Sequence, residues 1–290
     1  MKSRDYVRVA SGLLLVSALL AACVAHKPTL APITTAPDAV PAPGKFVWYD
    51  LLTEDVDGVR KFYGELLGWK FVATEAPNYT LIEHDGRPIG GIVDMTELDP
   101  DANQSQWVSL LSVPDVAAAV QATREAGGEI HVKPMAIPGR GTLAVVSDPR
   151  GALLAYVRAL GGDPPDRDPG IGSFMWTELW TDDLEASYGF YKDLIGYNLD
   201  EEIILDDVEY IVFENGDGPR AGVIVRPIDE VRPHWLPYLR VEDPSSLVDR
   251  VEELGGKVVL PPDEKIRHGT VAIVLDPSGA AVALQQWGES

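Results

Sequence analysis

Two short stretches of the chain place a carboxylate two residues after a tryptophan. They read VWYD, which holds Trp48 and Asp50, and MWTE, which holds Trp176 and Glu178. Alternate side chains of a β-strand point to the same face, so the two members of each pair share one face of a strand. A carboxylate beside an indole suits a cationic organic molecule through a cation–π contact, or a polar one through a charged hydrogen bond. These four residues are the first candidates for a ligand-binding site.

The same pairs also fit a purely structural role. A tryptophan on a half-buried strand often fills a core, and an acid at such a place is often paired with a base. Strand alternation adds Phe46 to the first face and Phe174 to the second. Arg240, on the same face of its predicted strand as Leu236, is the base that we expect to neutralise Glu178. We therefore include Arg240 among the candidate site residues.

Composition and motifs exclude several classes of function. The chain has 290 residues, of which 46% are hydrophobic, and this length suffices for two ordinary folded domains. A formal charge of −21 would repel a phosphate backbone, so we expect no nucleic-acid partner. The sequence holds no GxSxG, no HExxH, no Gly-rich phosphate loop and no paired CxxC, so hydrolase mechanisms have no support.

The chain contains a tandem duplication. The stretch FVWYDLLTEDVDGVRKFYGELLGW, which starts at Phe46, returns as FMWTELWTDDLEASYGFYKDLIGY, which starts at Phe174. The stretches DPRGA and DPSGA, which start at Asp148 and Asp276, match at the same offset of 128 residues. So many matches in one order at one offset indicate that a single domain has been copied.

Each copy divides into two similar halves. In the first half of the first copy, a strand rich in aromatic and branched residues precedes an amphipathic helix, which Asp55 caps and Gly68 ends. Three short strands follow, and the pattern starts again near Gln106 with Asp115 close to the second helix start. We predict strands at 45–53, 70–74, 79–85, 89–95, 107–113, 129–133, 142–148 and 153–159, and helices at 56–68 and 116–128. The predicted fold class is α+β, with four βαβββ units in the whole chain.

These features together resemble the glyoxalase/bleomycin resistance/dioxygenase group, the vicinal oxygen chelate (VOC) superfamily. The resemblance rests on the opening strand with its capping aspartate, the helix ending FYGELLGW, the GGI strand and the closing SDPRGALLAYV. It covers nearly all of residues 44–158 and 172–288. It implies two tandem VOC domains, each a pair of βαβββ units whose curled sheet forms a cup that holds the ligand.

The resemblance also implies where a metal would bind. In metal-using members, the first and last strands of the units carry His, Gln or Glu ligands, and two substrate oxygens complete the chelate. The corresponding positions in this chain hold Trp48, Val108 and Ala155 in the first domain, and Trp176, Leu236 and Ala283 in the second. None of these side chains can donate to a metal, so we predict no metal and no other cofactor.

Three functions remain in competition. The leading hypothesis is a protein that binds a small organic ligand in a metal-free cup, as bleomycin-resistance members do. The second is a metal-dependent lyase, isomerase or dioxygenase that uses Asp94, Glu178 or His234 in a non-standard ligand set. The third is an interaction protein of the cell envelope with filled cups. Whether the chain is an enzyme stays open at this point, as does whether the domains pair within one chain or across a homodimer.

The N-terminus predicts export and lipid anchoring. Residues 1–22 carry a basic start followed by an apolar run too short to span a bilayer, which is typical of a signal peptide. The run ends in LAAC, which resembles the lipobox of bacterial lipoproteins, and this implies that Cys23 is acylated with palmitate-like chains. Val24 follows instead of the aspartate that retains lipoproteins in the inner membrane, which favours the outer membrane. Residues 23–43, rich in Pro and Ala, are expected to be an extended tether, 44–158 and 172–290 the two domains, and 159–171 a linker.

Overall fold

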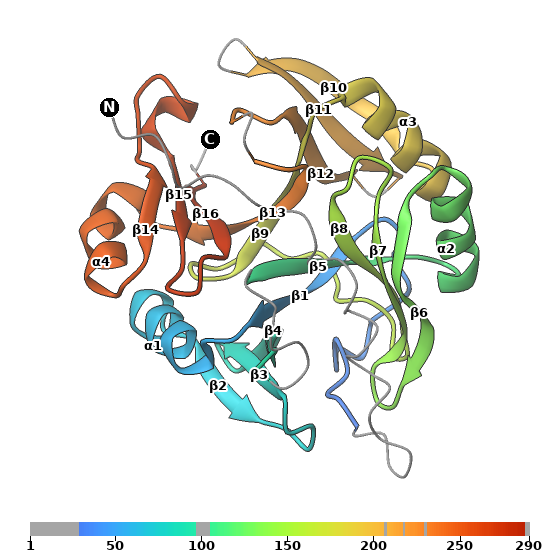
Figure 1. Ribbon diagram of the computed structural model, residues 1–290, viewed down its shortest axis with the longest axis horizontal. Helices are drawn as coiled ribbons and strands as arrows, with labels where there is room; N and C mark the ends of the chain where they lie inside the picture. The colour runs from blue at the N-terminus through green and yellow to red at the C-terminus, as the bar shows by residue number, and fades with distance from the viewer. Residues whose placement is uncertain (1–28, 97–104, 206–207, 217, 229–230, 288–290) are drawn as a thin grey trace.

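The structure, a computed structural model, describes residues 29–96, 105–205, 208–216, 218–228 and 231–287. It contains two eight-stranded mixed sheets, one in each copy of the repeat (Figure 1). The predicted signal peptide and Cys23 lie outside the described residues. Within the described part of the chain, no helix is long and apolar enough to cross a membrane.

Both domains contain the elements that the sequence predicted. Domain 1 consists of β1 (Phe46–Thr53), α1 (Val56–Leu67), β2 (Lys70–Ala73), β3 (Tyr79–His84), β4 (Arg87–Asp94), β5 (Gln106–Ser112), α2 (Val116–Glu125), β6 (Glu129–Ile137), β7 (Gly141–Ser147) and β8 (Leu153–Ala159). Domain 2 consists of β9 (Phe174–Thr181), α3 (Leu184–Ile195), β10 (Asn198–Leu205), β11 (Val208–Asn215), β12 (Gly218–Val225), β13 (His234–Val241), α4 (Val248–Glu253), β14 (Lys257–Leu260), β15 (Val271–Leu275) and β16 (Ala281–Gln286). Short 3₁₀ turns lie at Pro244–Leu247 and Arg267–Gly269. The predicted α+β fold with four βαβββ units is confirmed.

The ends of α1 show why these residues form a helix there. The side chain of Asp55 accepts a hydrogen bond from the backbone N–H of Gly58 over 2.9 Å, which satisfies one of the free donors of the first turn. Gly68 ends the helix in a left-handed conformation with φ of 72°, which a residue with a Cβ adopts only at a cost. Asp183 and Gly196 play the same two roles in α3.

The strand order brings the opening strands of the two units to the middle of each sheet. In domain 1 the order is β2-β3-β4-β1-β5-β8-β7-β6, where β1 is antiparallel to β5 and parallel to β4. Domain 2 repeats this as β10-β11-β12-β9-β13-β16-β15-β14. Each sheet curls so that its two halves face one another (Figure 1). We call the concave face of the first sheet cup 1 and that of the second sheet cup 2.

One part of the predicted strand face is wrong. The pairing of β1 with β5 shifts register between Phe46 and Trp48, and that of β9 with β13 shifts at the equivalent place. A bulge inserts one residue and so reverses the alternation beyond it. Trp48 and Asp50 therefore face cup 1, whereas Phe46 packs on Trp235 at the outer face, with ring centroids 4.7 Å apart. Phe174 likewise stacks on a ring of domain 1, outside cup 2.

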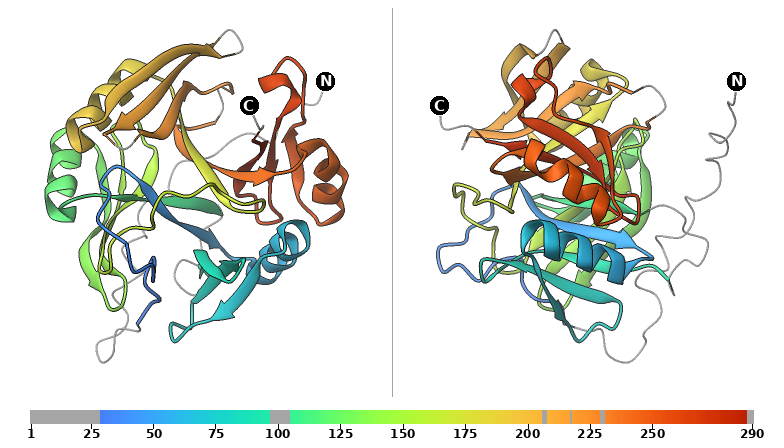
Figure 2. Two further views of the ribbon diagram at one scale, coloured as in Figure 1. Left: turned by 180° about the vertical axis from the view of Figure 1, so that it is seen from behind. Right: turned by 90° about the vertical axis from the view of Figure 1, so that its left-hand side faces the viewer.

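The two domains pack back to back. The outer faces of both sheets and the helices on them form one continuous hydrophobic core, so the cups open away from each other. Helix α1 lies beside α4 and α2 lies beside α3, as Figure 1 shows, and the view from behind in Figure 2 agrees. Tyr49 of β1 and Thr177 of β9 share a hydrogen bond of 2.7 Å across the centre of this interface.

The segment before β1 differs from the free tether that we expected. Ile33 is only 3% exposed and packs against the apolar face of cup 1. Farther along, the backbone N–H of Ala42 donates to Asp163 over 2.6 Å, and that of Gly44 donates to Ser112 over 2.8 Å. The Pro and Ala composition indicated low intrinsic structure, but it did not reveal that apolar residues of this segment match an apolar surface of the folded domain. Residues 29–43 are thus part of the folded body.

Candidate ligand-binding cups

Cup 1 holds a buried cluster of four polar and aromatic side chains. The carboxylate of Asp50 accepts hydrogen bonds from Nε1 of Trp48 over 2.9 Å and from the hydroxyl of Tyr79 over 2.7 Å. That hydroxyl accepts a hydrogen bond of 2.8 Å from Nη1 of Arg140. The guanidinium of Arg140 also lies over the Trp48 ring, 4.3 Å from its centroid. Trp48 and Arg140 are each 1% exposed, whereas Asp50 is half-buried.

The electrostatics of cup 1 follow from this burial. Desolvation raises the pKa of the Asp50 carboxyl, and the positive charge of Arg140 and the hydrogen bonds from Tyr79 and Trp48 oppose that rise. Burial also raises the pKa of the Tyr79 phenol, so it stays a donor to Asp50 at neutral pH. Arg140 and Asp50 are coupled through the tyrosine hydroxyl between them, which is a weaker arrangement than a direct ion pair.

Cup 2 holds the related cluster with a direct ion pair. Glu178 is 1% exposed, and its Oε1 accepts hydrogen bonds from Nε1 of Trp180 over 2.9 Å and from the hydroxyl of Tyr238 over 2.7 Å. Its Oε2 accepts one from Nη2 of Arg267 over 2.5 Å. Burial alone would lower the pKa of the Arg267 guanidinium, but the charge of Glu178 together with the Tyr238 and Tyr210 phenols more than offsets this and raises it. A buried pair with this many hydrogen bonds has fixed geometry.

Aromatic rings surround the ion pair of cup 2. The guanidinium of Arg267 lies 5.6 Å from the ring centroid of Tyr210 and 5.3 Å from that of Tyr238. Nε1 of Trp176 donates to the hydroxyl of Tyr210 over 2.9 Å. Trp176 is half-buried and the side chain of Arg267 is 16% exposed, so solvent reaches this cluster.

A glycine beneath each tyrosine hydroxyl makes room for the clusters. A Cβ at Gly91 would lie 2.0 Å from the hydroxyl oxygen of Tyr79, and a Cβ at Gly222 would lie 1.8 Å from that of Tyr210. Gly91 pairs with Asp50 and Gly222 with Glu178 on neighbouring parallel strands. The GG stretch of the predicted strand thus has a steric reason, since any side chain there would expel the tyrosine.

The structure brings Trp48 with Asp50, and Trp176 with Glu178, into the cups as predicted, but it places Arg240 elsewhere. Nη1 of Arg240 donates to Asp168 over 3.1 Å and to the carbonyl of Pro169 over 2.6 Å, and so it fastens the linker to domain 2. On its strand, Arg240 lies four residues beyond Leu236, the residue that pairs with Glu178. Four residues of strand span about 13 Å, which is more than an arginine side chain reaches. The true partner of Glu178 is Arg267.

The sequence contained a weak signal for the residues that were missed. Arg140 and Arg267 both precede the third strand of a second unit, in the stretches GRGT and RHGT. Arg140 and Arg267 are 127 residues apart and Tyr79 and Tyr210 are 131 apart, so neither pair follows the offset of 128 that relates the two copies. Small insertions and deletions between the copies account for both departures.

The side chains in the cups do not fit a metal. At the places where metal-using members carry ligands stand Trp48, Val108, Ala155, Trp176, Leu236 and Ala283, and their side chains offer no oxygen, sulfur or imidazole donor. Among the described residues, no group of three or more His, Cys, Asp or Glu could hold a metal ion.

The alternative metal ligands also do not form a set. Asp94 lies at the end of β4 in domain 1 and accepts a hydrogen bond from the backbone N–H of Thr96, whereas Glu178 and His234 lie in domain 2. His234 pairs with Trp180 at the start of β13, and its Nδ1 is 2.9 Å from the carbonyl oxygen of Arg232. Burial lowers the pKa of His234. With Glu178 bound to Arg267, the three residues share no centre.

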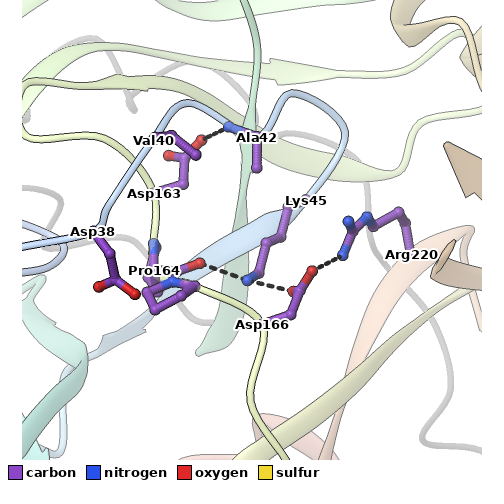
Figure 3. A pocket seen from close by; sticks show the side chains of 9 residues that line it. Asp38, Val40, Ala42, Lys45, Asp163, Pro164, Asp166 and Arg220 are labelled. Carbon is purple, nitrogen blue, oxygen red and sulfur yellow. Dashed lines mark hydrogen bonds and ion pairs between the residues drawn. The ribbon is translucent and has the colours of Figure 1, made fainter. Parts of the chain in front are cut away.

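Two pockets lie along the linker between the domains. One, of about 420 Å³, is bordered by the segment before β1 and by the linker (Figure 3). In it Nζ of Lys45 binds Asp166 over 2.6 Å, and Nη1 of Arg220 binds the same carboxylate over 2.9 Å. A second, of about 320 Å³, continues along the other side of the linker between the two domains. Ion pairs already join the side chains that meet in the first pocket, so it serves to hold the linker in place.

Comparison with known proteins agrees with this geometry. A profile of the glyoxalase/bleomycin resistance protein/dioxygenase superfamily matches residues 45–156 and 171–284, which are the two cup-forming domains. The chain belongs to this superfamily. Its tandem organisation is therefore two VOC domains in one polypeptide.

Relatives of similar length share both domains. The anthracycline biosynthesis protein DnrV of Streptomyces peucetius is 31% identical over 264 residues, which cover 86% of this chain and 95% of that protein. The putative glyoxylase CFP32 of Mycobacterium bovis is 27% identical over 237 residues, which cover 80% of this chain and 91% of that protein. The Mn(II)-bound glyoxalase of Novosphingobium aromaticivorans superposes with a TM-score of 0.56 at 16% identity, and the superposition covers 82% of this chain and 80% of that chain. At this identity the last similarity shows the VOC fold alone.

Proposed function

We propose that this VOC protein binds a small planar organic molecule in cup 2 without a metal. The observation that carries the proposal is the pair of Glu178 and Arg267, which is fixed by hydrogen bonds and walled by the rings of Trp176, Tyr210 and Tyr238. Aromatic walls bind flat ligands by stacking, and fixed polar groups on such a wall set their orientation.

The charge balance of cup 2 narrows the ligand class. A lone Glu178 would favour a cation, but Arg267 neutralises it, so the cup presents donors and acceptors without a net charge. A neutral planar ring system with carbonyl and hydroxyl groups matches these features. The relative DnrV is named for anthracycline biosynthesis, and the ring system of an anthracycline, without its sugar, is of this type.

A titration with the sugar-free, uncharged ring system of an anthracycline tests the proposal. We expect one molecule to bind per chain, and quenching of tryptophan fluorescence measures the binding. Naphthoquinone, which has a simpler ring system, should bind with the same stoichiometry. Glu178→Gln should weaken binding by about tenfold or more, because a hydrogen bond to a charged group contributes ~1.5–3 kcal/mol. The matched control is Glu209→Gln, which changes an exposed acid one residue before Tyr210. Absence of binding by both ring systems, or equal binding by the two variants, would reject the proposal.

The same protein can be tested for the competing metal-dependent function. Titration with Ni, Zn, Mn and Fe(II) should show no stoichiometric binding in the cups, because the expected ligand positions carry no donors. Tight stoichiometric metal that is lost in Glu178→Ala would instead support a metal-dependent lyase or dioxygenase.

We also propose that the chain is exported and anchored to the bacterial envelope through an acylated Cys23. The basic start, the short apolar run and the LAAC motif support this. The folded body begins by Leu30, and seven residues of extended chain span at most ~25 Å, so an acylated Cys23 would hold domain 1 close to the lipid surface. Partition of the wild-type protein into detergent, together with release of Cys23→Ser into the aqueous phase, is the expected result. A Cys23→Ser protein that still partitions into detergent would contradict it.

A further inference from the structure

The segment Leu30–Ile33 lies across cup 1. Figure 1 shows this part of the chain, in blue, between the β3 and β4 side and the β6 side of the first sheet, and the reverse view in Figure 2 agrees. Ile33 is 3% exposed, and Leu30 and Ala31 pack against the same apolar cluster that contains Trp48. The N–H of Leu30 donates to the carbonyl of Pro138 over 3.0 Å. The segment occupies the space where a ligand of cup 1 would lie.

The loop before β7 is shaped to receive this segment. Gly139 has φ of +80°, and a Cβ at this position would lie 2.2 Å from the carbonyl oxygen of Leu30. Only glycine permits this approach without displacing the segment. The contact is therefore specific and is not a chance collapse of apolar residues.

Arg140 has a hydrogen-bond donor without an acceptor beneath the segment. Nε donates to the carbonyl of Ala31 over 3.1 Å and Nη1 to Tyr79 over 2.8 Å, while Nη2 is buried and has no hydrogen-bond partner among the described residues. A buried donor without an acceptor is costly, and more so when it carries charge. In cup 2 the corresponding Nη2, that of Arg267, is bound to Glu178.

The geometry of a guanidinium lets Nε and Nη2 of Arg140 bind one ligand together. Nε–H and one N–H of Nη2 point from the same edge, and this edge receives a carboxylate through two parallel hydrogen bonds. The carbonyl of Ala31 offers a single oxygen. It accepts the hydrogen bond of Nε and leaves Nη2 of Arg140 without an acceptor. A carboxylate would accept hydrogen bonds from both, with the Trp48 ring beside it.

We propose that cup 1 is a binding site for a small aromatic carboxylate, and that the segment Leu30–Ile33 is an internal latch which the carboxylate displaces. The proposal is independent of the function proposed for cup 2, because its residues all lie in domain 1. Once the latch is released, the apolar face that Ile33 covers is free to receive the ring of the ligand.

The test uses 1-naphthoate as the probe and uncharged 1-naphthamide as its comparator. Ile33→Ser weakens the latch and should raise the affinity for naphthoate at least about tenfold, because a competing segment within the chain lowers apparent affinity. Val40→Ser is the matched control, since Val40 lies in the same N-terminal stretch but is 66% exposed, and it should bind as the wild type does. Added to Ile33→Ser, Arg140→Lys should remove the gain, because lysine cannot form the two parallel hydrogen bonds.

Hydrogen exchange on the unaltered protein provides a second readout that needs no variant. Saturating naphthoate should speed exchange of the Leu30 amide, which the latch protects, and leave the Gly44 amide, bonded to Ser112, unchanged. The proposal is overturned if Ile33→Ser gains no affinity, if naphthamide gains as much as naphthoate, or if the Leu30 amide does not respond. None of these results depends on binding in cup 2, so the two proposals can fail separately.

Discussion

The phenol of Tyr63 in domain 1 donates a hydrogen bond to the carboxylate of Asp276 in domain 2 over 3.1 Å. The duplication repeats this contact in the opposite direction, since Tyr191 of domain 2 donates to Asp148 of domain 1 over 3.0 Å. In each case the phenol oxygen also accepts a hydrogen bond from a tryptophan Nε1 within its own domain. The DPxG turn of each domain is thus bound by the helix of the other, which makes the two domains one unit.

Loss of either phenol should weaken the pairing of the domains. Tyr63→Phe leaves the Asp276 carboxylate and the Trp107 indole N–H without their shared partner in a buried place, and this costs about 1–3 kcal/mol. Tyr191→Phe should cost a similar amount. Urea unfolding measures both, with Tyr188→Phe as the control, because the half-buried Tyr188 ring packs on Phe213 away from either contact. Equal stability of all three variants would show that the phenol hydrogen bonds contribute nothing.

The ion pair of cup 2 should behave as a coupled unit. Glu178→Leu leaves Arg267 charged and without its main partner, and we expect a loss of about 3 kcal/mol. Arg267→Met added to Glu178→Leu should recover most of that loss, because removing both charges removes the desolvation cost. Chemical unfolding of the wild type, the two single variants and the double variant forms a thermodynamic cycle. Purely additive losses would contradict the direct pairing.

The buried aspartates predict the pH dependence of stability. Burial raises the pKa of Asp276 and of Asp148 in the folded protein, although several hydrogen bonds oppose the rise. A raised folded pKa gives stability that is fully present below the unfolded pKa, near ~3.9, and is lost as pH rises through the folded value. The free energy of unfolding of Asp276→Asn minus that of the wild type should therefore increase as pH rises from about 4.

The control for this pH dependence has the opposite sign. Hydrogen bonds from the hydroxyl and the N–H of Ser245 lower the pKa of Asp243, so its contribution is present above the unfolded pKa and is lost as pH falls. Unfolding measured at several pH values should give slopes of opposite sign for Asp276→Asn and Asp243→Asn. Slopes of the same sign would reject the assigned pKa directions.

The glycines under the two tyrosine hydroxyls should be intolerant of substitution. Gly222→Ala places a methyl group 1.8 Å from the Tyr210 hydroxyl, and Gly91→Ala does the same to Tyr79 at 2.0 Å. Overpacking of this kind costs about 1–3 kcal/mol and should also disturb ligand binding in cup 2 for the Gly222 variant. In Gly189→Ala, a helix position with no atom within 4 Å of the added Cβ, we expect a gain of about 0.5–1 kcal/mol. Thermal unfolding separates these outcomes, and a tolerated Gly222→Ala would show that Tyr210 has room to move.

Much of the fold could be predicted because its signals are local or regularly spaced. Asp55 and Gly68 mark the ends of one helix by capping chemistry that needs only neighbouring residues. Half of each site could be predicted in the same way. Trp48 and Asp50 are two residues apart on one strand, and so are Trp176 and Glu178 on another, so the members of each pair share a face. The other half came from distant strands and turns, and a wrong partner, Arg240, was chosen for Glu178 because strand alternation fixes the face but not the distance along it.

By itself, the sequence determined the duplication, the four βαβββ units, the superfamily and the absence of donor side chains at its metal positions. Only the tertiary structure decided that Arg267 reaches Glu178, that Arg140 reaches Asp50 through the Tyr79 hydroxyl, that the segment before β1 lies in cup 1, and that the domains share a core. The physical reason is the separation along the chain of the residues that interact. Caps, turns and strand alternation depend on residues close together in the chain, whereas these contacts join residues 61 to 213 positions apart, as with Arg140 and Tyr79 or Tyr63 and Asp276. Such contacts depend on how bulges and insertions bring distant residues into register, which no local pattern specifies.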